Sequence, residues 1–292
     1  MSSKKCNIGG QAVIEGVMMK SRKKLSVAVR LPDRKISVRK ERFVSLSERF
    51  AFLGWPFIRG FVSLIETMHI GMKTLIYSAN MQLEEGEKAE PLSTGHVALS
   101  VLLAITFAIV LFKVLPLAVA TLIARFTTLG QNRLMFNLVD GLVRICVFVS
   151  YVYLISLMKD MRRVFEYHGA EHKVIACYEA GKELTPKNAA MFTTVHRRCG
   201  TTFMIIVLLV AIVVFSVVPI NLPFFLLLLV RLPLLIPIAA VSYELLKLGA
   251  KHKKNIILRA LSAPGLWLQR ITTREPTREQ LEIAIAAIKA VI

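Results

Sequence analysis

The chain has 292 residues, 55% of them hydrophobic, and its mean hydropathy is +0.58. A soluble domain has about 45–50% apolar residues, so this composition favours a membrane protein. The formal net charge of +19 could also indicate nucleic-acid binding, but the chain lacks the aromatic and basic motif of RNA-binding sheets. Cytoplasmic loops of membrane proteins are rich in Lys and Arg as well, so we expect a lipid bilayer and no nucleic acid as partner.

Residues 1–50 predict a basic, β-rich segment on the cytoplasmic side. They contain three short runs rich in Val and Ile, which is typical of strands. The last two runs are joined by Leu31-Pro32-Asp33-Arg34, which has the composition of a hairpin turn. The predicted strands cover residues 12–17, 25–30 and 35–39.

Residues 51–96 predict an amphipathic helix followed by a linker. Pro56 suits a first helical position, and residues 57–78 carry a polar stripe on an otherwise apolar helix. These charges favour a helix that lies in the membrane interface or against the bundle over one that spans the membrane. Residues 82–90 are predicted to form an acidic linker.

Four apolar segments of about bilayer length predict four transmembrane helices. The fold class is therefore mainly α: a polytopic helical membrane protein with a small N-terminal β segment and amphipathic helices at the membrane surface. The first pair of spans lies within residues 97–158 and the second within 203–248. The predicted spans are residues 97–124, 136–158, 203–218 and 224–248.

The distribution of Lys and Arg predicts a multi-pass protein of the inner membrane with both termini cytoplasmic. Nearly all of these residues fall in segments 1–96, 159–202 and 249–292. The turn between the first two spans contains only two of them, and the turn between the last two spans contains none. Four cysteines without paired spacing fit reduced thiols facing a cytoplasm. The tail, 249–292, predicts two helices, the second starting with a capping box at Thr277 and Gln280.

A candidate metal site lies in residues 159–202, which we expect to form a loop between the second and third spans. His168 and His172 share a helix face if the segment is helical, so both imidazoles can point at one ion. With Glu171 they match H-x-x-E-H, the pattern of inverted zinc peptidases, although no large peptidase domain is visible. Further donors follow in the same segment: Glu179, His196 and Cys199. The alternative is that all these groups are loop caps and hydrogen-bond partners.

The segment from Gly9 to Met19 is the second candidate. Its glycines allow another element to approach closely, and they flank Glu15, which could reach a shared site. The spacing differs from that of a phosphate-binding loop. A plain turn bracketed by glycines is the alternative that we favour slightly.

Charged residues inside the predicted spans form the third candidate. Asp140 and Arg144 can pair along one helix face, and Arg231 interrupts the last span. Such charges indicate either a functional path or contacts between helices. Arginines near the histidines, Arg198 among them, could bind an anionic substrate or a lipid headgroup, or could only enforce topology.

Four motifs together resemble the YqhQ-like bacterial family, domain of unknown function 1385, described as predicted metal-dependent membrane proteins. The motifs are residues 9–19, 167–173, 196–201 and 272–276. Where the family pattern has Pro in the third motif, this chain has Arg197, which loosens the local turn. The resemblance implies that the polar residues of the family's motifs correspond here to Gln11, Glu15, His168, Glu171, His172, His196, Arg198 and Cys199.

The leading hypothesis is a membrane enzyme, hydrolytic in type, with a divalent metal at its cytoplasmic face and zinc as the expected ion. His168 and His172 would be ligands, with Cys199 or His196 completing the set. Glu171 would act as general base on a water that the metal activates, and Glu15 would contact the site or the substrate. The alternative is a non-enzymatic scaffold, assembly factor or transporter component, with a membrane-protein partner or a second copy of the chain.

Overall fold

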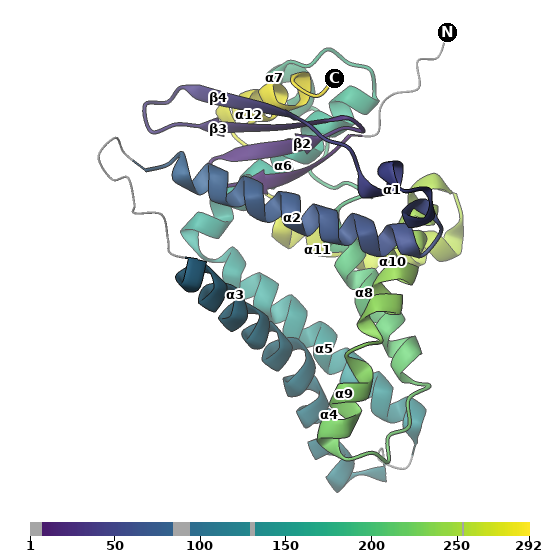
Figure 1. The fold of residues 1–292 in the computed structure, drawn as a ribbon. Helices are drawn as coiled ribbons and strands as arrows, with labels where there is room; N and C mark the ends of the chain where they lie inside the picture. The colour runs from purple at the N-terminus through teal and green to yellow at the C-terminus, as the bar shows by residue number, and fades with distance from the viewer. Residues whose placement is uncertain (1–7, 84–93, 129–131, 253) are drawn as a thin grey trace.

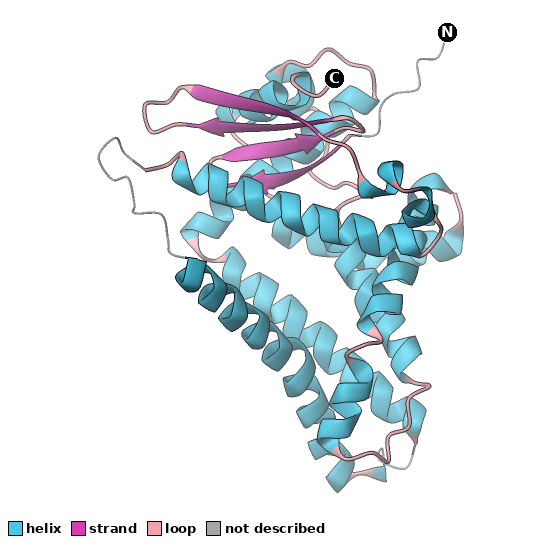
Figure 2. Ribbon diagram, viewed as in Figure 1, coloured by secondary structure: helices cyan, strands magenta, loops and turns pink. Residues whose placement is uncertain are grey.

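The computed structural model of the protein describes residues 8–83, 94–128, 132–252 and 254–292. It is mainly helical, with one small antiparallel sheet formed by the N-terminal segment (Figure 2). The strands follow one another in space in the order of the sequence, so the sheet is a meander. They are β1 (Gly9–Val13), β2 (Gly16–Lys20), β3 (Lys24–Arg30) and β4 (Ile36–Arg42).

The predicted β-rich N-terminus is confirmed, but the predicted strand at 12–17 is wrong in its limits. A tight turn at Ile14 and Glu15 divides it, and its two halves belong to different strands. Glu15, the second residue of this turn, has a φ of 51°, a left-handed conformation that residues other than glycine adopt rarely. The predicted turn after Leu31 is present, closed by the Leu31 N–H donating to the carbonyl of Lys35 at 2.9 Å.

Helices cover both faces of the sheet (Figure 1). On one face, α6 (Lys159–Glu179) and α12 (Arg278–Lys289) pack against side chains that include Val17, Met19 and Ala28. On the other face, Ile70 of α2 (Ile58–Asn80) packs against the side chains that alternate with them, such as Met18 and Val27. The predicted capping box at Thr277 is present at the start of α12.

The amphipathic helix predicted at 57–78 is confirmed as α2, and its apolar side faces away from the protein. Small and polar residues, including Glu66, Gly71 and Ser78, are buried. Apart from Ile70, large apolar residues along α2 are exposed, among them Phe61, Ile65, Met68, Met72, Leu75 and Ile76. A soluble protein would bury such a face, whereas a helix at a membrane surface would turn it towards lipid. Of the predicted acidic linker, residues 84–90 lie outside the described residues.

Among the described residues, two apolar stretches are long enough to cross a membrane. One is Leu99–Phe126, which runs through α3 (Thr94–Ile109), the π-helical turn η2 (Val110–Val114) and α4 (Leu115–Phe126). The other is α5 (Arg133–Ser156). Both project away from the sheet in Figure 1.

The second pair of predicted spans is less regular than the sequence suggested. Helix α8 (Gly200–Phe215) is apolar but has only 16 residues. The last span is divided into α9 (Phe224–Arg231) and α10 (Leu235–Lys251), which are bent by 44° and would count as a third crossing if taken as one. The break follows Arg231 and contains Pro233, which removes a backbone donor from the helix.

The remaining elements are short or connect these layers. Helix α11 (Ile256–Thr272) packs along α8, so the tail returns to the bundle before it reaches the sheet. The short elements are α1 (Leu46–Arg49), η1 (Ala51–Gly54) and α7 (Pro186–Ala190).

Candidate metal centre

His168 and His172 lie in the middle of α6, which has 21 residues, and not in the loop that the sequence suggested. The segment is helical because Phe165, Tyr167 and Val174 bury an apolar face against neighbouring elements. This helix places the two imidazoles one turn apart on the same side.

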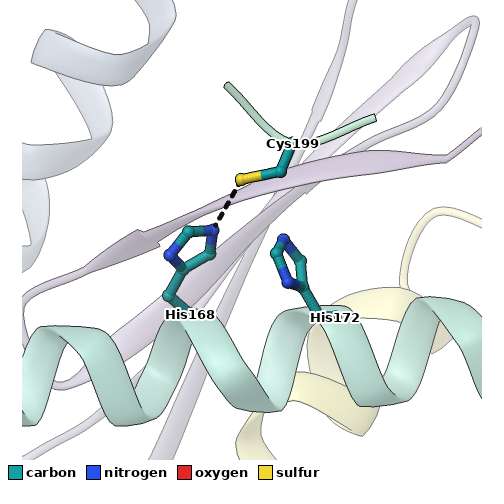
Figure 3. Close-up of side chains that lie close together, drawn as sticks. All are labelled: His168, His172 and Cys199. Carbon is teal, nitrogen blue, oxygen red and sulfur yellow. Dashed lines mark hydrogen bonds between the residues drawn. The ribbon is translucent and has the colours of Figure 1, made fainter. Parts of the chain in front are cut away.

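The third donor is Cys199, at the N-cap of α8. One ligand atom from each of His168, His172 and Cys199 lies within 4.8 Å of the others, which makes the group a candidate site for one metal ion. Nε2 of His168 lies 3.2 Å from the sulfur of Cys199, and the rings of the two histidines stand edge to face (Figure 3). Negative charge is favoured at a helix N-terminus, which suits a thiolate ligand there.

Both imidazoles are oriented by backbone carbonyls. Nδ1 of His168 donates to the carbonyl of Thr272 at 2.8 Å, and Nδ1 of His172 donates to the carbonyl of Thr194 at 2.5 Å. A carbonyl oxygen only accepts, so the proton of each neutral ring must be on Nδ1. The lone pair of each ring is therefore on Nε2. Histidine ligands of metal sites are usually held in this way.

The contact to Thr272 depends on a glycine. A Cβ on Gly169 would lie 2.0 Å from the carbonyl oxygen of Arg274, so only glycine lets the 272–274 segment lie this close to α6. The N–H of Arg274 also donates to the carbonyl of Phe165 at 2.9 Å. Gly169 is thus needed for the geometry that orients its neighbour His168.

Burial changes the protonation of the site. It raises the pKa of the Glu171 carboxyl above its usual value, while His168, His196 and the backbone of Gly10 act in the opposite direction. Burial also lowers the pKa of His172, which favours the neutral ring that a metal requires. A buried carboxyl of raised pKa holds its proton to a higher pH than an exposed carboxyl does.

A family profile described as "Protein of unknown function (DUF1385)" matches residues 55–292. The chain belongs to the DUF1385 family. It is also 32% identical to "Uncharacterized protein YqhQ" of Bacillus subtilis (strain 168) over 295 residues, covering 97% of this chain and 92% of the relative. No solved structure matches the chain.

The four motifs that suggested this family meet at the candidate site. The first supplies Gly10, where an added Cβ would lie 3.0 Å from the Glu171 carboxyl carbon. The second supplies the histidines, the third supplies Cys199, and the fourth supplies the Thr272 carbonyl. Residues that are up to 190 positions apart in the chain therefore touch around one helix, as the contact between Arg198 and the carbonyl of Ile8 illustrates.

His196 lies beside the group but not within it. Its ring centre is 5.5 Å from that of His172, and its Nε2 is 3.7 Å from Glu179, which also pairs with Arg198. The pairing with His196 and Arg198 lowers the pKa of Glu179. These three residues form a polar rim at the end of α6.

Glu15 and Gln11, both predicted from the first motif, do not face the candidate metal group. Glu15 pairs with Arg163 and accepts a hydrogen bond from Tyr167, so it holds the β1–β2 turn against α6 one residue before His168. Gln11 faces the opposite side of the sheet, where a Cβ on Gly71 of α2 would lie 2.5 Å from its side-chain oxygen.

Sequence reasoning missed Gln269 and the two orienting carbonyls. Gln269 is fully buried; it accepts from the N–H of His196 at 2.7 Å and donates to the His196 carbonyl at 2.9 Å and to the Thr202 hydroxyl at 2.8 Å. A Gln in an amphipathic helix gives no signal of such a role. Backbone carbonyls have no signal in the sequence at all.

The charged residues of the predicted spans meet in a separate cluster. Asp140 accepts hydrogen bonds from Arg144 at 2.6 Å and from Arg231 at 3.1 Å, and all three are at least 97% buried. The cluster lies in the helical bundle and includes none of the metal-site residues.

Proposed function

We propose that this protein is a multi-pass membrane enzyme with a divalent metal, zinc, held by His168, His172 and Cys199, and that it catalyses a hydrolytic reaction. The observation that carries the proposal is the shared orientation of the two imidazoles. Each donates its Nδ1 proton to a backbone carbonyl, so its lone pair is on Nε2, and Nε2 of His168 lies 3.2 Å from the Cys199 sulfur.

The donor set suits zinc. Two imidazole nitrogens and one thiolate are ligands that zinc takes in proteins, and three protein ligands are typical of catalytic sites, which keep one position open. When bound, zinc would lower the pKa of a coordinated water to near neutral. The chain itself would supply Glu171 to hold the proton that is removed and to deliver it to a leaving group.

The exposed apolar surfaces support a proposal for the position of the site relative to the membrane. We propose four crossings, with α8 and the bent α9–α10 pair completing the bundle begun by Leu99–Phe126 and α5. Helix α2 would lie in the interface with its apolar face in lipid. The sheet, α6 and α12 would then stand at the cytoplasmic face of the inner membrane, together with both termini.

In domain terms, we propose a cytoplasmic unit formed by the sheet segment, 1–50, the α6 segment, 159–202, and the tail, 249–292. The interfacial segment, 51–96, would connect it to the spans in 97–158 and 203–248. An anionic substrate or lipid headgroup would approach along the polar rim of Glu179, His196 and Arg198.

Metal analysis of the purified full-length protein tests the proposal. We expect about one zinc per chain, and we expect the double substitution His168→Ala and His172→Ala to remove it. His69→Ala is the matched control, because His69 is exposed on α2. Equal metal content in the wild type and the double variant would refute the proposed site.

A further inference from the structure

A second site lies in the helical bundle, where two arginines share one carboxylate and a lysine lies nearby. Arg144 and Arg231 both bond to the same oxygen, Oδ2, of Asp140. Lys113 joins them: its ammonium group lies 4.4 Å from the centre of the Phe215 ring, and the two guanidinium groups lie 5.1 and 5.0 Å from it. One carboxylate cannot balance two guanidinium groups, so the cluster has an excess of positive charge in an apolar bundle.

Several polar atoms of this cluster have no hydrogen-bond partner among the described residues. They include Nε and Nη1 of Arg144 and Nε of Arg231, all donors, and Oδ1 of Asp140, an acceptor. Arg231 is further held by Asn137, which accepts from its Nη2 at 2.5 Å. A cluster that only held helices together would need one arginine for the carboxylate and would leave no buried donors unused.

The helices are interrupted on both sides of the cluster. Lys113 lies in the π-helical turn η2, and Arg231 is the last residue of α9 before the bend into α10. Both kinds of interruption are frequent at binding sites within membrane bundles, because irregular backbone is tolerated there only when it lines a cavity or a ligand.

A half-open pocket of about 210 Å³ lies between α4, α5, α9 and the connection from α8 to α9, one side chain away from the cluster. Arg125 and Phe136 are among its lining residues, and the Arg231 guanidinium lies 6.0 Å from the Phe136 ring centre. Phe136 therefore lines the cavity and also contacts the cluster, and Arg125 adds a positive charge to the cavity wall.

We propose that Arg144, Arg231 and Lys113 bind a phosphate group that carries a hydroxyl. The unpaired N–H groups would donate to its anionic oxygens. Its remaining hydroxyl would donate to Oδ1 of Asp140, which needs a donor. The ligand would be free inorganic phosphate or the phosphomonoester of a lipid. This proposal is independent of the metal site.

Equilibrium binding of labelled inorganic phosphate to the detergent-purified full-length protein tests this site. A chelator is present, and the metal-site double variant is measured alongside, so that phosphate at a metal ion is not counted. We expect one saturable site per chain in both proteins. Arg144→Gln and Arg231→Gln should weaken binding about tenfold or more. Arg133→Gln, an exposed arginine on the same helix as Arg144, should leave it unchanged.

Arg231→Lys keeps the buried charge while removing the unpaired Nε, so it should fold and still bind more weakly. Sulfate, which has no hydroxyl near neutral pH, should not compete in the wild type. It should compete in Asp140→Asn, where the amide can donate to a sulfate oxygen.

To test for a lipid ligand, two lipids compete with labelled phosphate: phosphatidic acid, a phosphomonoester, and phosphatidylglycerol, a phosphodiester without a phosphate hydroxyl. Competition by phosphatidic acid alone would identify a lipid ligand, and competition by neither would identify free phosphate. Absence of saturable phosphate binding together with absence of phosphatidic acid binding would overturn the proposal. Phosphate binding equal to that of the wild type in Arg144→Gln, Arg231→Gln and Arg231→Lys would overturn it too.

Discussion

Nε2 of His168 and the sulfur of Cys199 lie 3.2 Å apart, although the two residues are 31 positions apart in the chain. His168 is in the middle of α6 and Cys199 begins α8, so the contact joins the helix against the sheet to a helix of the bundle. A metal ion between these atoms would therefore connect the two layers of the protein. Removal of the metal should destabilise the fold as well as abolish the proposed hydrolytic reaction.

The thiol of Cys199 should determine which metals bind. Cys199→Ser replaces a soft sulfur with a weak oxygen ligand, so we expect zinc affinity to fall at least about tenfold. Cobalt-substituted protein should lose its sulfur-to-metal absorption band. Cys146→Ser, at an exposed free cysteine, is the control and should keep the band. A band of full strength in Cys199→Ser would mean that sulfur is not a ligand.

The variant Glu171→Gln tests whether Glu171 acts in catalysis or only in maintaining the structure. Gln fills the same space and keeps a hydrogen-bonding side chain next to Gly10, but it cannot accept a proton. We expect normal metal content and an unchanged unfolding temperature, with loss of complementation in a strain that lacks the gene. Full complementation by this variant would favour the scaffold hypothesis over the enzyme.

The two glycines at the start of β1 should respond differently to substitution. A Cβ on Gly10 would lie 2.6 Å from the carbonyl oxygen of Met18 and 3.0 Å from the Glu171 carboxyl carbon, whereas nothing lies within 4 Å of a Cβ on Gly9. Gly10→Ala should therefore cost about 1–3 kcal/mol of unfolding free energy. Gly9→Ala should stay within about 0.5 kcal/mol of the wild type. Thermal unfolding of both variants checks this, and equal midpoints would contradict it.

Stability of the metal-free protein should fall as the pH drops below 6.5. Burial lowers the pKa of His172 from its ordinary 6.5, so below that pH the unfolded chain binds a proton that the folded chain excludes. The loss is at most about 1.4 kcal/mol for each pH unit between the unfolded and folded pKa values. Unfolding measured from pH 7.5 to 5.5 should show a smaller loss in His172→Gln than in His69→Ala. The same loss of stability with falling pH in both variants would argue against His172 as its cause.

The apolar face of α2 should lie at shallow depth in lipid. A tryptophan at Ile65, with Trp55 and Trp267 changed to Phe, should be quenched most by bromines near the headgroups. A tryptophan at Ile105, exposed on the long helical stretch of α3, should be quenched most by bromines deep in the acyl chains. Equal depth profiles for the two positions would show that α2 is not an interfacial helix.

Local patterns in the sequence predicted much of the fold. Apolar length predicted α5 and the Leu99–Phe126 stretch, and composition predicted the hairpin turn after Leu31 and the cap at Thr277, because these features depend on neighbouring residues alone. The break after Arg231 was harder to predict, since a helix with one proline can kink or end. The division of the first strand at Glu15 depends on a left-handed backbone conformation that glutamate rarely adopts.

The sequence by itself determined which donors are available: two histidines four apart, a carboxylate between them and a cysteine further on. The tertiary structure alone decided that Cys199 and not His196 completes the group, and that Glu15 pairs with Arg163. It also decided that Asp140, Arg144 and Arg231 share one cluster. The physical reason is that spacing along one helix fixes a shared face, whereas contacts between distant segments depend on how helices pack.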